Sequence, residues 1–303
     1  MAKPGIDQQI AQLEGSNSKL LQYPTQFTQG IMPKMIHSHN DSSGLPVSRR
    51  MSLSLQWDAF REFHPEKLRV YRACADFHHA QVGHEAAALT PDRTLDSLYI
   101  QPLLQILKKQ NPRNAFTANS TSPNGVFDTA SGTPLQLLID IKTDGVEALP
   151  FILKALQPLR AAGYLTTALA NGTITPSAVT VVGTGNSPLA QVKALSPRDY
   201  FFDAPLTQLT DPSLNTTWDP TLSPLASTDY ETAVGWNGIG NITDEQRANI
   251  TRFVGDAHAR GITARFWDTP AWPVHARENI WRTLSEEGAD WLNADDLAAA
   301  SSF

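Results

Sequence analysis

Three residues that could do chemistry stand together in the segment MIHSHND. His37 and His39 flank Ser38, and Asn40 comes next. An imidazole changes its charge near neutral pH, so it can serve as a general base or a general acid. The spacing of the two histidines also allows a zinc site completed by Asp268, although no later pair of histidines supports it. The alternative for either histidine is an ordinary surface or turn residue.

A second group of polar residues follows apolar runs further along the chain. Asp140 and Lys142 end the run LLIDIK, and Asp203, Trp267 and Asn293 end later runs. Charged and amide groups at the ends of buried strands cost free energy unless they are paired or used. Polar residues at nearly every such end therefore indicate a site. The alternatives are that Asp140 is a structural carboxylate bonded to Lys142 or to backbone amides, and that Trp267 is a core residue.

These residues need a scaffold in which the ends of several strands meet. Apolar runs predict strands at 35–39, 135–141, 178–183, 200–203, 232–236, 262–267 and 290–293, and helical spacing predicts helices at 95–109, 146–162, 243–260 and 274–287. Thr243 and Gln246 form the capping-box pattern of a helix N-terminus. Residues 204–231 are rich in Pro, Thr and Ser and are expected to form a long loop.

Strands that alternate with helices predict parallel βαβ units. The seven strand candidates, with room for an eighth after the first, match the (β/α)₈ TIM barrel, whose active site forms at the carboxyl ends of the strands. A doubly wound open sheet is the alternative, but it usually begins with a glycine-rich turn, which is absent here. We expect residues 1–30 to be a loosely ordered leader and residues 31–303 to be a single barrel domain.

The composition limits the kinds of partner that the protein is expected to bind. The chain has 303 residues, 41% of them apolar, and a formal net charge of −6. This charge argues against a nucleic-acid surface but permits a small anionic substrate held by a few local cations. No apolar run is long enough to span a membrane, and the first residues lack the apolar region of a signal peptide. Cys74 is the single cysteine, whereas several N-x-S/T sequons favour a secretory route, so localisation stays open.

Five segments together resemble one fungal family. MIHSHND, VGHEAAALTPDRTLDSLYIQPLLQIL, LLIDIKTDG, ARFWDTPAWP and ADWLNADDL are similar, in this order, to the altered inheritance of mitochondria protein 6 family. The resemblance covers about residues 20–41 and 82–303. It implies a (β/α)₈ barrel of the phospholipase-C-like phosphodiesterases, which are distant relatives of glycerophosphodiester phosphodiesterases and spider-type sphingomyelinase D.

The resemblance also implies catalytic roles. His37 matches the first catalytic histidine and His84 the second, and Asp140 matches a carboxylate ligand of a divalent cation, Mg²⁺ or Ca²⁺. Such a cation would neutralise the charge of a phosphodiester. One histidine would act as base or nucleophile, and the other would protonate the leaving alkoxide.

Four further positions match substrate contacts in the related proteins. Lys142 matches a phosphate-facing lysine, Asn40 lies beside the first histidine, and Trp267 and Asn293 match positions at the barrel mouth. The expected function is hydrolysis of a phosphoric diester in a glycerophosphodiester- or phospholipid-like substrate. Neither a nucleic-acid partner nor a transmembrane segment is expected.

The segment 42–81 departs from the family pattern. Relatives carry a Glu-x-Asp pair at the end of strand two that completes the cation site, and Cys74-Ala75-Asp76 is only a faint echo of it. A shifted reading frame, a misjoined exon or a divergent insertion would each explain the difference. A cation held by Asp140 with only Asp76 to help would bind weakly, and loss of strand two would open an edge in the barrel. The alternative function is therefore a catalytically impaired pseudoenzyme or a binding barrel.

Overall fold

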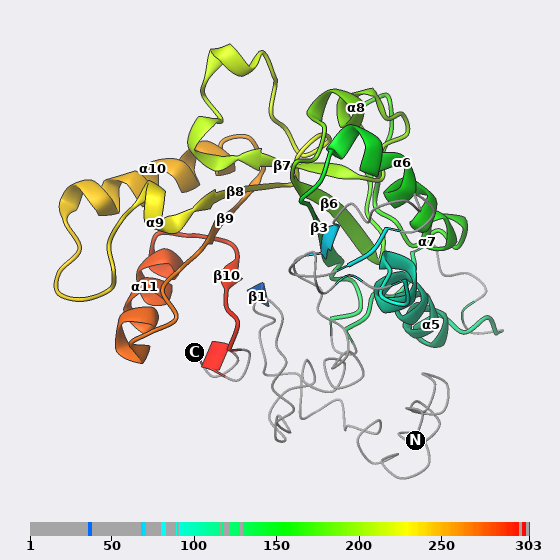
Figure 1. Cartoon of the computed structure of the whole chain (residues 1–303), viewed down its shortest axis with the longest axis horizontal. Helices are drawn as coiled ribbons and strands as arrows, with labels where there is room; N and C mark the ends of the chain where they lie inside the picture. The colour runs from blue at the N-terminus through cyan, green and yellow to red at the C-terminus, as the bar shows by residue number, and fades with distance from the viewer. Residues whose placement is uncertain are drawn as a thin grey trace, which may run out of the picture.

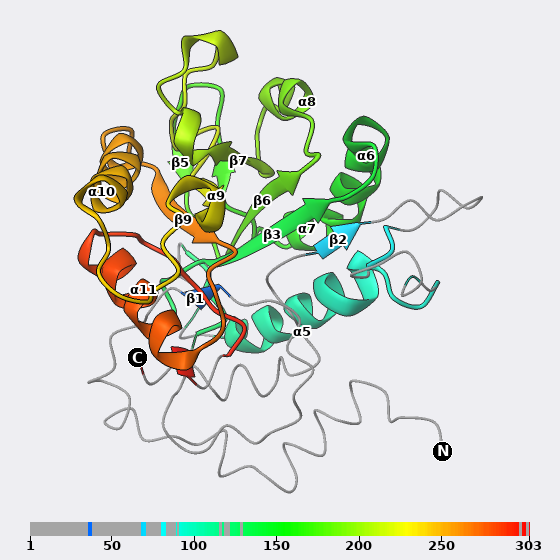
Figure 2. The same cartoon turned by 60° about the vertical axis from the view of Figure 1, so that its left-hand side comes forward.

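A curled parallel β-sheet with helices along its outer side organises the chain in the computed structural model (Figures 1 and 2). The structure describes residues 36–37, 68–70, 80–82, 89, 91–114, 117, 122–127, 130–296, 299–300 and 303. The whole of the expected leader, residues 1–30, and most of the segment 42–81 therefore lie outside the described ranges. The division into leader and barrel domain stays a prediction.

The main sheet has six strands in the order β2-β3-β6-β7-β8-β9. The bounds are β2 Leu68–Val70, β3 Leu135–Ile141, β6 Val179–Gly185, β7 Phe201–Pro205, β8 Leu225–Asp229 and β9 Thr263–Trp267. Every neighbouring pair is parallel. The spatial order follows the chain order without the reversal that defines a doubly wound sheet, so that alternative is excluded.

Two short strands extend this arrangement. β1 (Ile36–His37) and β10 (Leu292–Asn293) pair in parallel with each other. A parallel bridge between Arg265 and Trp291 joins the approach to β10 to strand β9. Among the described residues no pairing joins β1 to β2, so the curled parallel sheet is confirmed whereas a closed (β/α)₈ barrel is not.

Helices connect most of the strands. Their bounds are η2 Asp96–Ile100, α5 Gln101–Gln110, α6 Gly145–Ala155, α7 Gln157–Ala161, α8 Leu189–Ala194, η3 Leu206–Gln208, η4 Pro212–Leu214, α9 Tyr230–Ala233, α10 Asp244–His258 and α11 Val274–Glu286, with a small antiparallel hairpin of β4 (Thr167–Ala168) and β5 (Ile174–Thr175) after α7. The capping box predicted at Thr243 and Gln246 is confirmed at the start of α10. Within the described part of the chain, no helix combines the length and the apolar character needed to cross a membrane.

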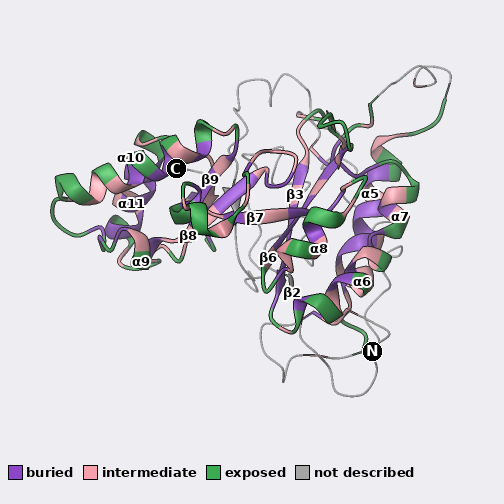
Figure 3. Ribbon diagram, turned by 90° about the horizontal axis from the view of Figure 1, so that it is seen from above, coloured by how far each residue is buried: buried purple, intermediate pink, exposed green. Residues whose placement is uncertain are grey.

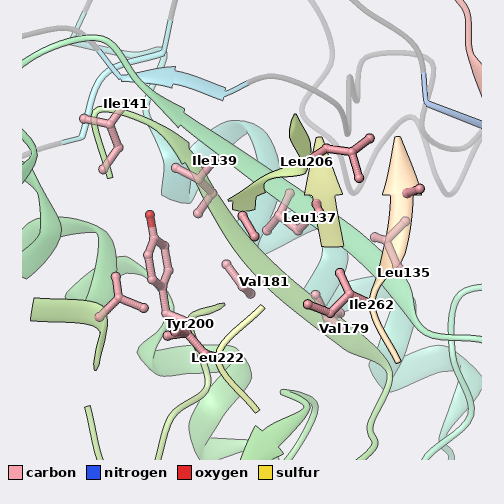
Figure 4. Close-up of a cluster of buried hydrophobic side chains, with 14 of the residues drawn as sticks. Leu135, Leu137, Ile139, Ile141, Val179, Val181, Tyr200, Leu206, Leu222 and Ile262 are labelled. Carbon is pink, nitrogen blue, oxygen red and sulfur yellow. The ribbon is translucent and has the colours of Figure 1, made fainter. Parts of the chain in front are cut away.

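The two faces of the sheet bury different groups of side chains. Alternate residues of β3, from Leu135 to Ile141, belong to the main core cluster together with side chains of the surrounding helices. Figure 4 shows these residues beside Val179 and Val181 of β6. Leu138, Val182, Phe201 and Leu225 form a smaller cluster on the opposite, inner face. Both faces of these strands are therefore covered, which explains the nearly continuous apolar run of β3 and its almost complete burial (Figure 3).

One predicted strand is wrong. The segment 232–236 was expected to be a strand, but helix α9 and a following turn occupy it, and the real strand is β8 at Leu225–Asp229, inside the expected loop 204–231. β8 reads LASTD, and its inward residue Ser227 is polar. A search for alternating apolar residues could not find this strand, because some of its inward positions carry polar side chains.

The second strand is present. The segment 42–81 was expected to lack strand two, but β2 lies inside it and pairs with the end of β3, with Leu68 opposite Ile139 and Val70 opposite Ile141. The expected open edge beside β3 is therefore wrong. β2 also supplies the eighth strand for which the spacing left room.

Candidate active site

Asp140 is the central charged residue on the inner face. Because side chains alternate along a strand, Asp140 projects to the same face as Leu138, and it is buried. Its Oδ2 lies 2.8 Å from Nζ of Lys142, whose side chain is 33% exposed. The alternative given for Asp140, a buried carboxylate bonded to Lys142, is confirmed, whereas its role as a cation ligand stays a prediction. The pair joins a sealed carboxylate to a cation that still reaches solvent.

A glycine on the neighbouring strand makes room for this carboxylate. Gly185 ends β6 with a φ of +65°, and a Cβ built on it would lie 2.3 Å from Oδ1 of Asp140. Any side chain at this position would displace the carboxylate as well as strain the backbone. Gly183, Thr184 and Gly185 all belong to strand β6, and Gly185 at its end shapes the space around Asp140.

Polar side chains continue across the inner face at the same level. Thr184 is opposite Asp140 in the register of β3 and β6. On the next strands, Oγ of Ser227 donates a hydrogen bond of 2.5 Å to Oδ2 of Asp203. These four residues come from four different strands, β3, β6, β7 and β8, so only the curvature and register of the sheet bring them together. The inner face is apolar below and polar at its carboxyl end.

This layer of polar side chains on the inner face continues onto β9 and β10, where it ends. Arg265 is 1% exposed, and its Nη2 donates a 2.8 Å hydrogen bond to Oδ1 of Asn293. Asn293 is buried and pairs in register with His37 of β1. The register therefore brings the backbone of the expected catalytic histidine next to an expected substrate contact.

Burial and charge shape the titration of this layer. Burial raises the pKa of Asp203, whose Oδ1 is sealed from solvent, and the positive charge of Arg265 and the hydrogen bond from Ser227 act in the opposite direction. The charge of Asp140 adds to the upward shift. Burial also raises the pKa of Tyr200, whose hydroxyl lies 3.3 Å from Oγ of Ser187. At both residues burial thus disfavours the negatively charged form.

The remaining expected residues fall into two groups. Trp267 is the last residue of β9 and is half-buried, at the level where the polar layer meets the loops. His84, Asn40 and Asp76 lie outside the described residues, and the structure describes His37 only through its strand. The assignments of these four residues stay predictions.

Two further residues near the carboxyl ends of the strands have structural roles. Trp236, the last residue of the segment expected to be a strand, follows α9 and packs in the main core. Asp296 accepts a hydrogen bond from the backbone N–H of Ala299 at 3.0 Å and also pairs with Arg277. Asp296 therefore acts as a helix cap.

The described residues do not complete a cation site. No group of three His, Cys, Asp or Glu side chains suited to a metal ion occurs in the described ranges. Asp140, the expected ligand, has Lys142 on one oxygen, and Asp203 is hydrogen-bonded to Ser227. A hard cation such as Mg²⁺ or Ca²⁺ requires several oxygen ligands, so the described part of the chain alone does not fit it.

Two residues of the polar layer were missed by sequence reasoning. Ser227 was missed because its strand was read as a loop. Arg265 was overlooked although it stands between Ala264 and Phe266 in a buried strand, and an arginine in such a run is costly unless it is paired. An arginine within an apolar strand was therefore the feature of the sequence that could have indicated a functional residue.

Comparisons with known proteins agree with these features. Residues 70–203 match the model of an AIM6-like phosphodiesterase domain. The "Altered inheritance of mitochondria protein 6 homolog" of Arthroderma benhamiae is 41% identical over 290 residues, which are 94% of this chain and 88% of the relative. The altered inheritance of mitochondria protein 6 of Eremothecium gossypii is 31% identical, covering 88% of this chain and 69% of that protein. No solved structure matches the chain.

The extent of the family match also bears on the aberrant segment. The matched region begins at residue 70, inside 42–81 and before Val82, where the quoted motifs resume. Residues 70–81 therefore belong to the family region, so the boundary expected at Val82 is too late. The origin of the remaining part of the segment stays open between the three explanations given above.

Proposed function

This chain belongs to the altered inheritance of mitochondria protein 6 family, and on that premise we propose that it hydrolyses a phosphodiester bond. The matching domain is described as phosphodiesterase-like, which supports this reaction class. The observation that carries the proposal is the Asp140–Lys142 pair at the polar end of the inner sheet face. A partly exposed ammonium held by a buried carboxylate suits an anionic phosphoryl group. The substrate we propose is a glycerophosphodiester or a phospholipid-like diester.

The proposed mechanism gives each residue a separate task. Lys142 neutralises the charge on a non-bridging oxygen of the phosphodiester, and Asp140 holds the ammonium group of that lysine in place. His37 removes a proton from the attacking water, the new P–O bond forms, and the bond to the leaving alkoxide breaks. His84 protonates that alkoxide. For these roles, β1 and β2 must approach each other and close the (β/α)₈ barrel.

Three further contacts position the substrate in this proposal. Asn40 beside the first histidine and Asn293 on β10 supply amide N–H groups to phosphoryl oxygens. Trp267 at the end of β9 covers the organic part of the substrate. A small-molecule or lipid diester fits such a set of contacts better than a polymer does, and the net charge of −6 supports the exclusion of nucleic acid.

A divalent cation, Mg²⁺ or Ca²⁺, is a separate part of the proposal. Asp140 would be one of its ligands, and the other oxygens would have to come from residues outside the described ranges, with Asp76 as the candidate. When bound, the ion would neutralise charge on the phosphodiester.

The competing candidate is a catalytically impaired binding barrel. The observation that favours it is the lack, within the described residues, of three metal-ligating side chains in one place. Such a protein would keep Lys142 and Asn293 as binding groups and would hold a phosphodiester without cleaving it. Turnover distinguishes the two candidates, because binding alone is common to both.

The deciding experiment measures turnover of bis-(p-nitrophenyl) phosphate with Mg²⁺, with Ca²⁺ and with EDTA. We expect turnover by the wild type and a loss of roughly a thousandfold or more in kcat for His37→Ala, because general acid–base groups contribute on this scale. His275→Ala is the matched control, since His275 is exposed on α11. EDTA sensitivity tests the cation separately. Turnover that survives in His37→Ala would contradict the assignment of that histidine, and no turnover with any metal would favour the binding barrel.

A further inference from the structure

Arg265 is a buried cation to which the proposed reaction gives no role. It lies in the middle of β9, 1% exposed, between the fully buried Ala264 and Phe266. Burying a guanidinium costs several kcal/mol unless other groups compensate it. A residue such as leucine would fill the same volume without that cost. The contacts of Arg265 should therefore explain why an arginine is buried at this position.

Arg265 holds the carboxamide of Asn293. Its Nη2 donates to Oδ1 of Asn293 at 2.8 Å. A guanidinium carries only donors, so the atom of Asn293 that faces it must be the carbonyl oxygen. The hydrogen bond from Arg265 thus decides which way this amide points. The shape of the side chain alone does not, because the amide oxygen and nitrogen can exchange places by a 180° rotation.

The other end of the same amide is unbonded as far as the described residues go. Nδ2 of Asn293 makes no hydrogen bond with any residue of the described ranges, and 7% of the residue's surface is exposed. A buried asparagine with a fixed carbonyl and an amino group left unbonded by these residues is a preorganised donor. A ligand that completes it must bring an acceptor, and an anionic oxygen is the strongest one.

The position of Asn293 gives this donor a neighbour. Its register partner on β1 is His37, the residue proposed as the base. Arg265 is held on the other side, where its positive charge acts on Asp203 of β7. A row of polar residues therefore runs from Asp203 through Arg265 to Asn293 and ends beside the proposed catalytic histidine.

We propose that Arg265 is a positioning residue that locks the carboxamide of Asn293 so that Nδ2 donates to a phosphoryl oxygen of the substrate. The inference rests on the proposed function and assigns to that same site a residue that does not touch substrate. Arginine suits the task better than lysine, because its planar fork is always charged and has fixed donor directions. Asp203 supports the arrangement as the counter-charge.

A double-mutant cycle tests this role. We expect Arg265→Met and Asn293→Ala each to lower kcat/KM for bis-(p-nitrophenyl) phosphate by roughly tenfold to a hundredfold, the worth of one hydrogen bond to a charged group. The double variant should be no more than about threefold worse than Asn293→Ala, since Arg265 acts only through Asn293. If the losses of the two single variants multiply in the double variant, the proposal is overturned. An Arg265→Met protein with the kcat/KM of the wild type would also overturn it.

Asn293→Asp separates positioning from mere stability. The new carboxylate would pair with Arg265 and should raise the midpoint of thermal unfolding, whereas it removes the donor and repels the phosphodiester. We expect a higher melting temperature together with at least a tenfold lower kcat/KM. Arg265→Lys keeps the charge and should fall between wild type and Arg265→Met. An Asn293→Asp protein with wild-type kcat/KM would contradict the role.

A measurement that needs no turnover keeps this inference distinct from the proposed function. The side-chain amide of Asn293 can be followed by nuclear magnetic resonance in selectively labelled full-length protein while inorganic phosphate is added. We expect its resonances to shift in the wild type and not in Arg265→Met. If the wild type cleaves no diester, the proposed hydrolysis fails, but a phosphate-dependent shift still supports the positioned donor. An absent shift in the wild type would overturn it.

Discussion

The β3 end and the β9–β10 end of the inner face handle charge in different ways. On β3, the buried Asp140 pairs with Lys142, the residue that directly follows the strand, and Lys142 reaches solvent. On β9, Arg265 is sealed and is hydrogen-bonded to Asn293 from another strand. The first cation can meet an anionic ligand itself. The second is sealed from solvent, and the ligand contact that we propose for it is made by Asn293, which it holds.

This difference separates binding from positioning. A charge that stays in contact with water costs little to keep and is screened until a ligand replaces the water. A charge that is sealed from solvent costs free energy to bury. Its interactions are stronger in the low dielectric of the interior, so it holds its hydrogen-bonding partner firmly. A charged site therefore gains from both kinds of residue, and exposure, not residue type, tells them apart. Four predictions test the comparison.

The largest effect is expected for the exposed cation. Lys142→Met removes the ammonium that we propose to face the phosphodiester, so kcat/KM for bis-(p-nitrophenyl) phosphate should fall by roughly a hundredfold or more. Lys108→Met is the matched control, because Lys108 is exposed on α5, and it should behave as wild type. Equal activity of the two variants would remove Lys142 from the site.

The next effect concerns the space beside Asp140. Gly185→Ala places a Cβ 2.3 Å from Oδ1 of Asp140 at a φ of +65°. We expect a loss of roughly 3 kcal/mol in the free energy of unfolding, from overpacking and backbone strain together. Gly172→Ala is the control, because its φ is +81° with nothing within 4 Å, so strain alone should cost about 1–2 kcal/mol. Denaturant titration of both variants measures the difference, and equal losses would show that the carboxylate has room to move.

The sealed part of the layer should respond to pH. Because burial raises the pKa of Asp203 above its ordinary value of 3.8, the folded state holds this proton more tightly than the unfolded state does. Its contribution to stability is therefore present at low pH and is lost as the pH rises above 3.8 and through the folded pKa. Asp203→Asn should flatten this decline. Unfolding free energies measured from pH 4 to pH 7 check it, and an unchanged pH dependence in the variant would contradict the direction of the shift.

The smallest effect is expected at the hydrogen bond to Asp203. Ser227→Ala removes a donor 2.5 Å from Oδ2 of Asp203, which should cost about 1–2 kcal/mol of unfolding free energy. Ser223→Ala is the control, because Oγ of Ser223 is buried without a hydrogen-bond partner. That variant should be neutral or slightly stabilised. If Ser223→Ala costs as much as Ser227→Ala, the loss reflects packing instead of the hydrogen bond.

The parts that could be predicted are those set by neighbours along the chain. β3 was expected at 135–141 and is found there, because seven residues with one charge are enough to mark a buried strand. The pairing of Asp140 with Lys142 is also local, since only Ile141, the last residue of β3, separates the two residues in the chain. The capping box of α10 is equally local.

The parts that could not be predicted depend on residues from different strands. β8 was misplaced because its inward Ser227 is polar, and the reason for that polarity, Asp203, lies on β7. Arg265 gave a signal of its own, but its partner Asn293 is far along the chain. For His84 and Asp76 the residue type suggests a role, whereas the distances that would test it lie outside the described ranges.

The amino-acid order by itself determined which residue types stand at the ends of the apolar runs, and hence the family, the strand and helix alternation and the Asp140–Lys142 pair. The tertiary structure decided which of those ends share one face and which of their charges are sealed. The physical reason is that hydrophobic periodicity reports only whether a side chain is buried. The partner that makes a buried charge tolerable is chosen by the curvature and register of the sheet, which bring β7, β8, β9 and β10 together.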